Sequence, residues 1–336
     1  AEPEKEIAKT LAGRFRLPDH FLAEAQQLAF VGLATKDSRM TRMACRYMLC
    51  TAACQDWCSD PMENAFPLVW HHRSFDECSA CYTMSYVLSL CGNSLTWHGR
   101  NVLYQALIMK GLPRIEADLM TMEYIYSMNQ GFAFSYGYVR ALITLSHVYP
   151  RYEKRIDEAE TLLFEMLDRA QNEDGSTDEG PAYWEYSFSS ALLALVPLAR
   201  KRGKDLRTYL GGRLDRTAAY GLFLLDSSLN TLTVSDSHGG KYSESIAEQM
   251  AGITGDERWL YVLEKRRGQE TARRFERPVY EEYPVIGMTS FIPAREPEEI
   301  RLIRKFNGLA NRDFASPGRI AIVIDRKAPD ATHFAA

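Results

Sequence analysis

Residues 131–202 read GFAFSYGYVRALITLSHVYPRYEKRIDEAETLLFEMLDRAQNEDGSTDEGPAYWEYSFSSALLALVPLARKR, and this stretch decides the fold class. It holds three long tracts with apolar residues at helical spacing, which predict helices over 131–148, 151–170 and 181–202. The tracts are joined by short segments that contain Pro, Asn, Asp and Gly, the usual turn formers. Short connections between helices are typical of antiparallel helix pairs. The stretch therefore predicts a mainly helical core.

The helical pattern continues on both sides of this stretch. Further helices are predicted over 74–90, 96–111, 114–128, 205–226, 243–252 and 257–267. With two more tracts that begin near Pro18 and Asp37, the sequence predicts about ten helices.

The character of the chain changes after residue 270. The segment Arg319-Ile-Ala-Ile-Val-Ile-Asp325 is rich in β-branched residues and predicts a buried strand. Two or three strands do not form a stable sheet domain alone. We therefore expect a helical domain over 1–270, and over 271–336 the start of a C-terminal β domain that continues beyond this sequence.

Composition and charge exclude several classes of protein. The chain of 336 residues carries 40 Lys and Arg against 44 Asp and Glu, and a net charge of -4 argues against bulk nucleic-acid binding. This net charge is still compatible with a locally basic cleft that holds an acidic substrate. Apolar runs fall short of the ~20 residues of a membrane helix, so no membrane span is expected. No leader pattern is visible, which favours the cytoplasm; a periplasmic or secreted protein with its leader removed is the alternative.

All seven cysteines lie within the first 91 residues. Cys50, Cys54 and Cys58 share one helical stripe, where neighbouring Cβ atoms are too far apart for an easy disulfide. The odd count also suits a reducing compartment. Cys78 and Cys81 form a CxxC pair close to two histidines, so a zinc site is the alternative. No second CxxC completes such a site, and we expect small buried residues and no metal.

The segment 172–187, NEDGSTDEGPAYWEYS, is the most informative for function. It is a turn-rich loop that leads into a helix, and Glu179 lies where the helix dipole favours negative charge. Tyr183 and Tyr186 are three positions apart and share one face of that helix. Phenols at a helix start beside an open loop can reach a cleft and move protons, although Tyr is also a common half-buried residue.

Three other segments can carry chemistry. Asn129 stands at a helix start, where it acts either as a cap or as an amide that donates a hydrogen bond to a substrate carboxylate. The cluster at 233–240 consists of turn formers, and His238 within it can line a site. His72 and Arg73 precede a helix. They are either surface residues or residues that bind an anionic sugar.

In order and spacing these segments resemble the heparinase II/III-type polysaccharide lyases and the related oligo-alginate lyases. Asp174-Gly-Ser-Thr-Asp-Glu-Gly-Pro-Ala-Tyr183 resembles their Asp-Gly…Glu-Gly-x-x-Tyr pattern. Residues 129–145 resemble the Asn-containing start of the helix that lines their cleft. Ser235-Asp-Ser-His238 resembles their Gly-Asp-Ser loop, with Ser235 in place of Gly. The resemblance covers about residues 70–240 and the strand region after 280.

This resemblance implies an incomplete (α/α)6-type toroid of about ten helices, followed by a β-sandwich domain. The implied reaction is β-elimination beside a uronic acid. Asn129 would hold the carboxylate and Tyr183 would be the acid and also able to serve as the base, while His238 and His333 are further proton-handling candidates. The residues expected to line the substrate are Gln130, Tyr186, Trp184, Glu179, His72 and Arg73.

The expected partner is an acidic polysaccharide or oligosaccharide, and no cofactor is implied. Many relatives carry Asn-His or Asn-Trp where this chain has Asn129-Gln130. The His-x-His-x-Asp run of the sandwich is not present, so the zinc of some relatives would belong to a part of the β domain beyond this sequence. Two alternatives stand beside the lyase: a toroid that only binds carbohydrate, and a glycoside hydrolase that uses Asp174, Asp178 and Glu179 as paired carboxylates.

Overall fold

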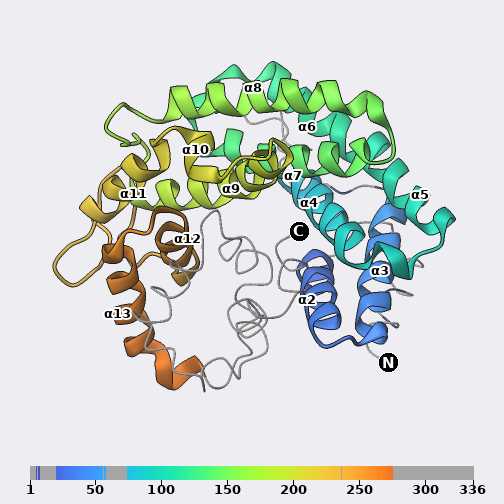
Figure 1. Ribbon diagram of the computed structural model, residues 1–336, viewed down its shortest axis with the longest axis horizontal. Helices are drawn as coiled ribbons and strands as arrows, with labels where there is room; N and C mark the ends of the chain where they lie inside the picture. The colour runs from blue at the N-terminus through green and yellow to red at the C-terminus, as the bar shows by residue number, and fades with distance from the viewer. Residues whose placement is uncertain are drawn as a thin grey trace, which may run out of the picture. The chain divides into compact units, whose positions relative to one another are not determined.

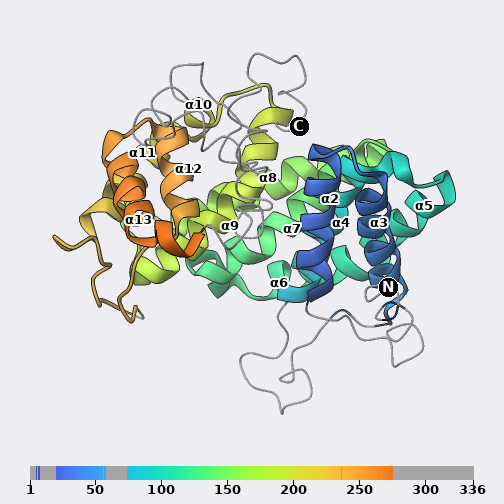
Figure 2. The same cartoon turned by 90° about the horizontal axis from the view of Figure 1, so that it is seen from below.

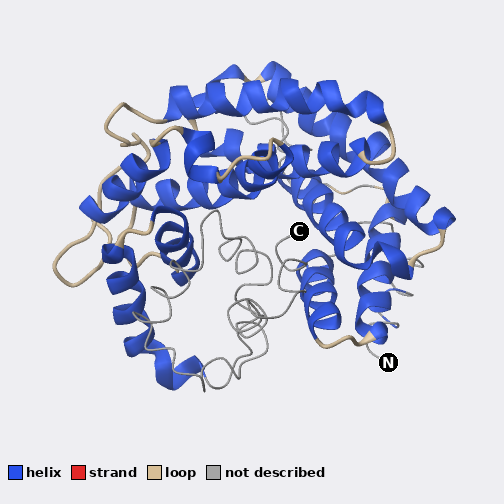
Figure 3. Cartoon of the chain, viewed as in Figure 1, coloured by secondary structure: helices blue, strands red, loops and turns tan. Residues whose placement is uncertain are grey.

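The computed structural model describes residues 20–55, 74–235 and 237–274, together with Lys5, Ile7 and Trp57, and side chains as far as Arg266. These residues form helices joined by loops, and no strand occurs among them (Figure 3). The expectation of a mainly helical fold is thus confirmed. No helix in these ranges is both long and apolar enough to cross a membrane.

The chain divides into two compact units, Ala1–Tyr126 with Gln130–Glu165 and Ser127–Asn129 with Met166–Ala336. The first unit contains the helices α2 (His20–Ala34), α3 (Ser38–Ala53), α4 (Phe75–Cys91), α5 (Trp97–Ala106), the π-helix η3 (Leu107–Gly111) and α6 (Leu112–Thr121). Helices α7 (Asn129–Ser146) and α8 (Glu153–Ala170) have residues in both units. Short 3-10 turns occur at Gly92–Ser94, Glu123–Ser127 and Pro150–Tyr152. The boundary between the units falls inside α8.

In the first unit α2, α3 and α4 pack against one another and lie side by side in both views (Figures 1 and 2). The turn between α2 and α3 is fixed by Asp37, whose carboxylate accepts the Arg39 backbone N–H at 2.8 Å. Such a cap satisfies a donor that the helix start leaves open. The aromatic rings of Phe21 and Tyr47 meet edge to face, with centroids 4.7 Å apart, in the core between these helices.

Helices α4 and α7 approach each other with their backbones nearly in contact. A Cβ atom at Gly137 would lie 2.1 Å from the Cys78 carbonyl oxygen. The Cys78 thiol donates to the Ala133 carbonyl at 2.8 Å and accepts the Gly137 N–H at 3.1 Å. Gly137 and Cys78 are therefore matched small residues at a helix crossing.

The described cysteines are all buried and free, namely Cys45, Cys50, Cys54, Cys78, Cys81 and Cys91. The expectation that they are small buried residues is confirmed. Cys58 lies outside the described residues.

The second unit contains α9 (Gly180–Lys201), α10 (Leu206–Leu210), α11 (Arg213–Phe223), α12 (Glu244–Thr254) and α13 (Glu257–Arg274). Helices α12 and α13 pack against each other in an antiparallel pair. The sequence predicts one helix over 205–226, and this prediction is wrong in one respect. Gly211 and Gly212 both take left-handed backbone angles (φ 57° and 80°), which end α10 and begin α11. The expected β domain lies in residues outside the described ranges.

Candidate functional site

The second unit brings Asn129 and Glu179 into direct contact. Asn129 is the first residue of α7, and Glu179 stands immediately before α9. The Asn129 backbone N–H donates to Glu179 Oε2 at 2.7 Å, and its side-chain Nδ2 donates to Glu179 Oε1 at 2.7 Å. One carboxylate thus fixes both the start of α7 and the orientation of the amide. Because Nδ2 carries two N–H groups, this pairing leaves one of them for a ligand.

Glu179 was expected to contact substrate, and the structure places its carboxylate on Asn129 instead. A carboxylate that holds an amide in one orientation acts on a ligand through that amide. We therefore treat Glu179 as a positioning residue. The sequence gives no signal for this pairing, because the two residues are separated by 50 positions.

The loop that contains His238 is anchored on the same turn. The Ser235 hydroxyl donates to the Asp178 carbonyl at 2.9 Å, across 57 positions of sequence. Next to it, Gly180 has a left-handed backbone (φ 83°), and a Cβ atom there would lie 2.5 Å from the Val234 carbonyl oxygen. Glycine is the residue that fits both the backbone angle and the contact. The segments around 129, 178–180 and 233–238 therefore meet in one place.

Tyr183 extends from the first turn of α9. It is half-buried, and its hydroxyl makes no hydrogen bond with any residue that the structure describes. Tyr183 follows Glu179 by four positions, a spacing that puts two side chains on the same side of a helix. Tyr183 and Glu179, which holds the Asn129 amide, are thus both at the N-terminal end of α9. Tyr186 is more open, with 41% of its surface exposed.

Acidic residues of the turn before α9 accept hydrogen bonds that stabilise this turn. Asp174 accepts the Ser176 N–H at 2.9 Å. Hydrogen bonds from the Ser176 side chain and from this N–H hold the pKa of the exposed Asp174 carboxyl below its usual value. The Tyr220 hydroxyl donates to the Thr177 carbonyl at 3.1 Å and ties the turn to α11. With Glu179 bound to Asn129, two of the three acids that a hydrolase would need are engaged in building the turn.

Trp184 lies in the core, and this position corrects the expectation that it lines the substrate. Its side chain is fully buried, with 0% exposed. Its Nε1 donates to Thr217 Oγ1 at 2.8 Å, and its ring stacks on Trp259 at a centroid distance of 5.8 Å. The apolar face of α9 requires a large side chain here, so Trp184 supports the helix that carries Tyr183.

The structure describes two of the other expected site residues, His238 and Gln130. His238 is exposed on the loop that Ser235 anchors. Gln130 is half-buried, and its Oε1 is enclosed without a hydrogen-bond donor among the described residues. His72, Arg73 and His333 lie outside the described residues.

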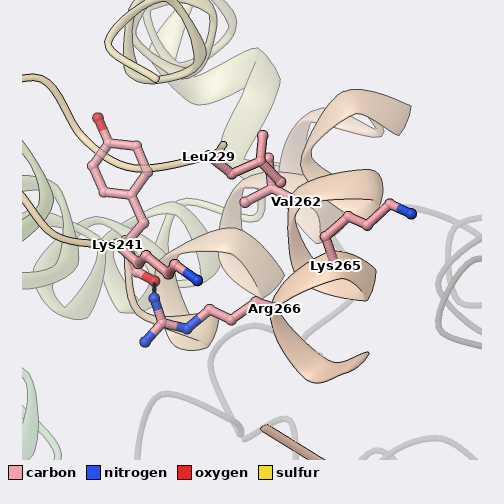
Figure 4. A pocket seen from close by; sticks show the side chains of 6 residues that line it. Leu229, Lys241, Val262, Lys265 and Arg266 are labelled. Carbon is pink, nitrogen blue, oxygen red and sulfur yellow. Dashed lines mark hydrogen bonds between the residues drawn. The ribbon is translucent and has the colours of Figure 1, made fainter. Parts of the chain in front are cut away.

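A basic pocket that the sequence did not point to lies in the same unit (Figure 4). It is a small hollow with a volume of about 10 Å³, and its lining comprises Leu229, Lys241, Tyr242, Val262, Lys265 and Arg266. The Arg266 guanidinium donates to the Tyr242 carbonyl, and Lys265 points away from it. Lys241 and Arg266 both line the hollow and give it positive charge, which favours an anionic group.

Glu185 connects α9 to the segment beside this pocket. Its Oε1 accepts the Ser243 N–H at 2.9 Å. Burial raises the pKa of Glu185, while the Ser243 hydrogen bond and the Arg266 charge act in the opposite direction. The chain around 242–243 is thereby fixed to the helix that carries Tyr183.

In the ranges 20–55, 74–235 and 237–274, no group of three or more His, Cys, Asp or Glu side chains is placed to hold a metal ion. No protein-family model matches the chain, and no curated protein matches it. The side chains and their contacts are therefore the basis for a function.

Proposed function

We propose that the chain is a polysaccharide lyase that cleaves a uronic-acid-containing glycan by β-elimination. The observation that carries the proposal is the pairing of the Asn129 amide with Glu179 at the start of α9, the helix that also carries Tyr183. Glu179 holds the Asn129 amide, and Tyr183 stands one helical turn further on with its hydroxyl unengaged among the described residues. These are groups that a lyase needs beside a sugar acid.

Each residue has a role in the proposed reaction. The second N–H of Asn129 Nδ2 donates to the uronate carboxylate and stabilises the charge that develops when C5 loses its proton. His238 removes that proton, the electron pair forms the C4=C5 double bond, and the C4–O4 bond breaks. Tyr183 then donates its phenolic proton to the departing O4. Glu179 positions the amide without touching the sugar.

Two further features support an acidic substrate. The pocket lined by Lys241, Lys265 and Arg266 concentrates positive charge in a chain whose net charge is -4. Its neighbour Ser243 is fixed to α9 through Glu185. A glycan with several acid groups would gain from cations beside the reacting sugar.

The proposal extends to the family and the whole fold. The motif order favours a heparinase II/III-type lyase, with the described helices as part of an (α/α) toroid and a β-sandwich that begins after residue 270. Six buried free thiols suit a reducing compartment, and we infer a cytoplasmic location.

Ultraviolet absorbance tests the reaction, because β-elimination creates an unsaturated sugar whereas hydrolysis does not. We expect the protein to release such a product from a uronic polymer. Tyr183→Phe should lower kcat by at least about 100-fold with the fold intact, which is the usual contribution of one general acid. Tyr261→Phe is the matched control, since Tyr261 is an exposed phenol on α13, and it should keep full activity. Reducing ends without absorbance would identify a hydrolase, and binding without product would identify a carbohydrate-binding protein.

Glu179→Gln tests the positioning role. The amide keeps the size of the side chain but loses one acceptor oxygen, so one of the two bonds to Asn129 is lost. We expect kcat to fall about tenfold with KM less affected, which corresponds to the loss of a hydrogen bond to a charged group. Steady-state kinetics of the absorbing product measures both constants. Unchanged kcat would contradict the role.

A further inference from the structure

A second group of polar side chains lies between α4 and α7 in the first unit, apart from every residue used above. Arg140 on α7 is half-buried, and its Cζ lies 5.6 Å from the centroid of the Tyr82 ring on α4. Its Nε is enclosed without a hydrogen-bond acceptor, and no ion pair joins Arg140 to a carboxylate among the described residues. An arginine remains charged at any physiological pH, so a half-buried one without a carboxylate is unusual.

Two hydroxyl groups on α4 are also buried without a hydrogen-bond partner among the described residues. Tyr82 is 2% exposed and Ser85 is 1% exposed, and neither hydroxyl has a hydrogen-bond partner in the described part of the chain. The two residues are three positions apart and lie on the same side of α4. Tyr86 stacks on Tyr82 at 6.3 Å, and Tyr136 meets it edge-on at 5.3 Å, so aromatic rings enclose the group.

Leaving these atoms unpaired is costly. An unsatisfied buried hydroxyl costs about 1–3 kcal/mol, and a charged group costs more. Buried polar atoms in native proteins are nearly always paired with protein, water or a ligand. Tyr82 Oη, Ser85 Oγ and Arg140 Nε have no such partner among the described residues, which favours a ligand at this place.

The charges of the group indicate the ligand. Burial raises the pKa of Tyr82 to about 12, while the nearby Arg140 side chain, through its charge and as a hydrogen-bond donor, acts in the opposite direction. One cation beside two neutral hydroxyl donors balances a single negative charge. The planar guanidinium edge formed by Nε and Nη matches a carboxylate with two parallel hydrogen bonds. A phosphate dianion would need a second cation.

We propose that Arg140, Tyr82 and Ser85 form a binding site for a carboxylate, supplied by a hexuronic acid or by a simple organic acid. Arg140 binds the carboxylate through its guanidinium edge, and the two hydroxyls donate to the same oxygens. The site stands independently of the lyase reaction, since it shares no residue with it.

Calorimetric titration of the full chain with D-glucuronate and with acetate tests the site, with D-glucose and inorganic phosphate as comparisons. We expect one or both carboxylates to bind and to raise the thermal midpoint, whereas glucose does neither and phosphate binds more weakly. Tight binding of glucuronate alone identifies a sugar acid, and equal binding of acetate identifies a simple acid.

Variants separate binding from folding. Arg140→Gln should weaken carboxylate binding at least about tenfold, while Arg151→Gln should not, although the Arg151 guanidinium also lies over a tyrosine ring (Tyr149, 5.5 Å). Tyr82→Phe and Ser85→Ala remove a single oxygen, so the free protein should keep its thermal midpoint and lose affinity several-fold.

Three results would overturn the proposal. These are no binding of either carboxylate at millimolar concentration, phosphate binding as tight as carboxylate, and unchanged affinity in both Arg140→Gln and Tyr82→Phe. The same titration on Tyr183→Phe should give unaltered affinity. A failed lyase and a failed carboxylate site are therefore distinguishable.

Discussion

At the scale of single residues, burial changes what a carboxylate does. Glu179 is held by two donors of Asn129, so it builds the site. Glu77, on the first turn of α4, is 3% exposed, and its Oε1 lies 3.9 Å from Arg114 Nε. Burial is the main influence on this carboxyl group, and it makes stability depend on pH near neutrality.

Burial raises the pKa of Glu77 to about 7, with Asp76 and Asp118 adding to the rise and a backbone hydrogen bond and the Arg114 charge opposing it. The native state therefore binds more protons than the unfolded chain between about pH 4.5 and 7, and stability falls as pH rises through this window. The full effect is about 3 kcal/mol of unfolding free energy above pH 7. Glu77→Gln should remove most of this slope and make the protein more stable at pH 8.

Urea unfolding at pH 5 and pH 8 measures the effect. Asp76→Asn, one position earlier on the same turn, is the control and should retain most of the slope. The prediction is contradicted if the unfolding free energy of Glu77→Gln differs between pH 5 and pH 8 by as much as that of the unchanged protein.

Sequence alone could identify Asn129 and Tyr183 as candidates, because helix-start residues beside a glycine-rich turn are visible locally. It could not assign the partner of Asn129, since no periodicity links positions 50 residues apart. It also misjudged Trp184, because an aromatic residue next to a motif has the same pattern whether it faces a cleft or the core. Trp259, which covers Trp184, comes from α13 far along the chain.

At the scale of elements, the long helices were predictable and the breaks were not. The tract predicted over 181–202 corresponds to α9, Gly180–Lys201, and the tract over 151–170 corresponds to α8, Glu153–Ala170. Periodicity over many turns specifies such helices well. Toward Gly111, by contrast, the predicted helix over 96–111 changes from α to π geometry. At that glycine a Cβ atom would lie 2.1 Å from Cys81 Sγ, a tertiary contact that no local pattern encodes.

The turn before α9 should tolerate no side chain at Gly180. Gly180→Ala meets both a left-handed backbone and the Val234 carbonyl, so we expect a loss of about 2 kcal/mol or more and loss of the loop that carries His238. Gly203→Ala is the matched control, because Gly203 is also left-handed (φ 65°) but has open space around its Cβ position. That variant should lose only about 1 kcal/mol. Chemical denaturation of both variants checks the difference, and equal losses would contradict the close contact.

At the scale of the whole molecule, the thiols report on the integrity of the fold. Six of the seven cysteines are buried and free. Burial raises the pKa of Cys45 to about 11 and that of Cys91 to about 12. Since the thiolate is the reactive form, such thiols react slowly while the fold persists.

Titration with an aromatic disulfide reagent should therefore label at most one thiol per native chain and all seven after denaturation. The released chromophore gives the count directly. Fast labelling of two or more thiols in the native protein would contradict the burial described for the first unit.

The boundary between the two compact units falls within α8, between Glu165 and Met166. A cut there would leave each fragment with a frayed helical end and unmatched backbone carbonyls or amides. We therefore expect fragments cut between Glu165 and Met166 to fold poorly when they are expressed separately.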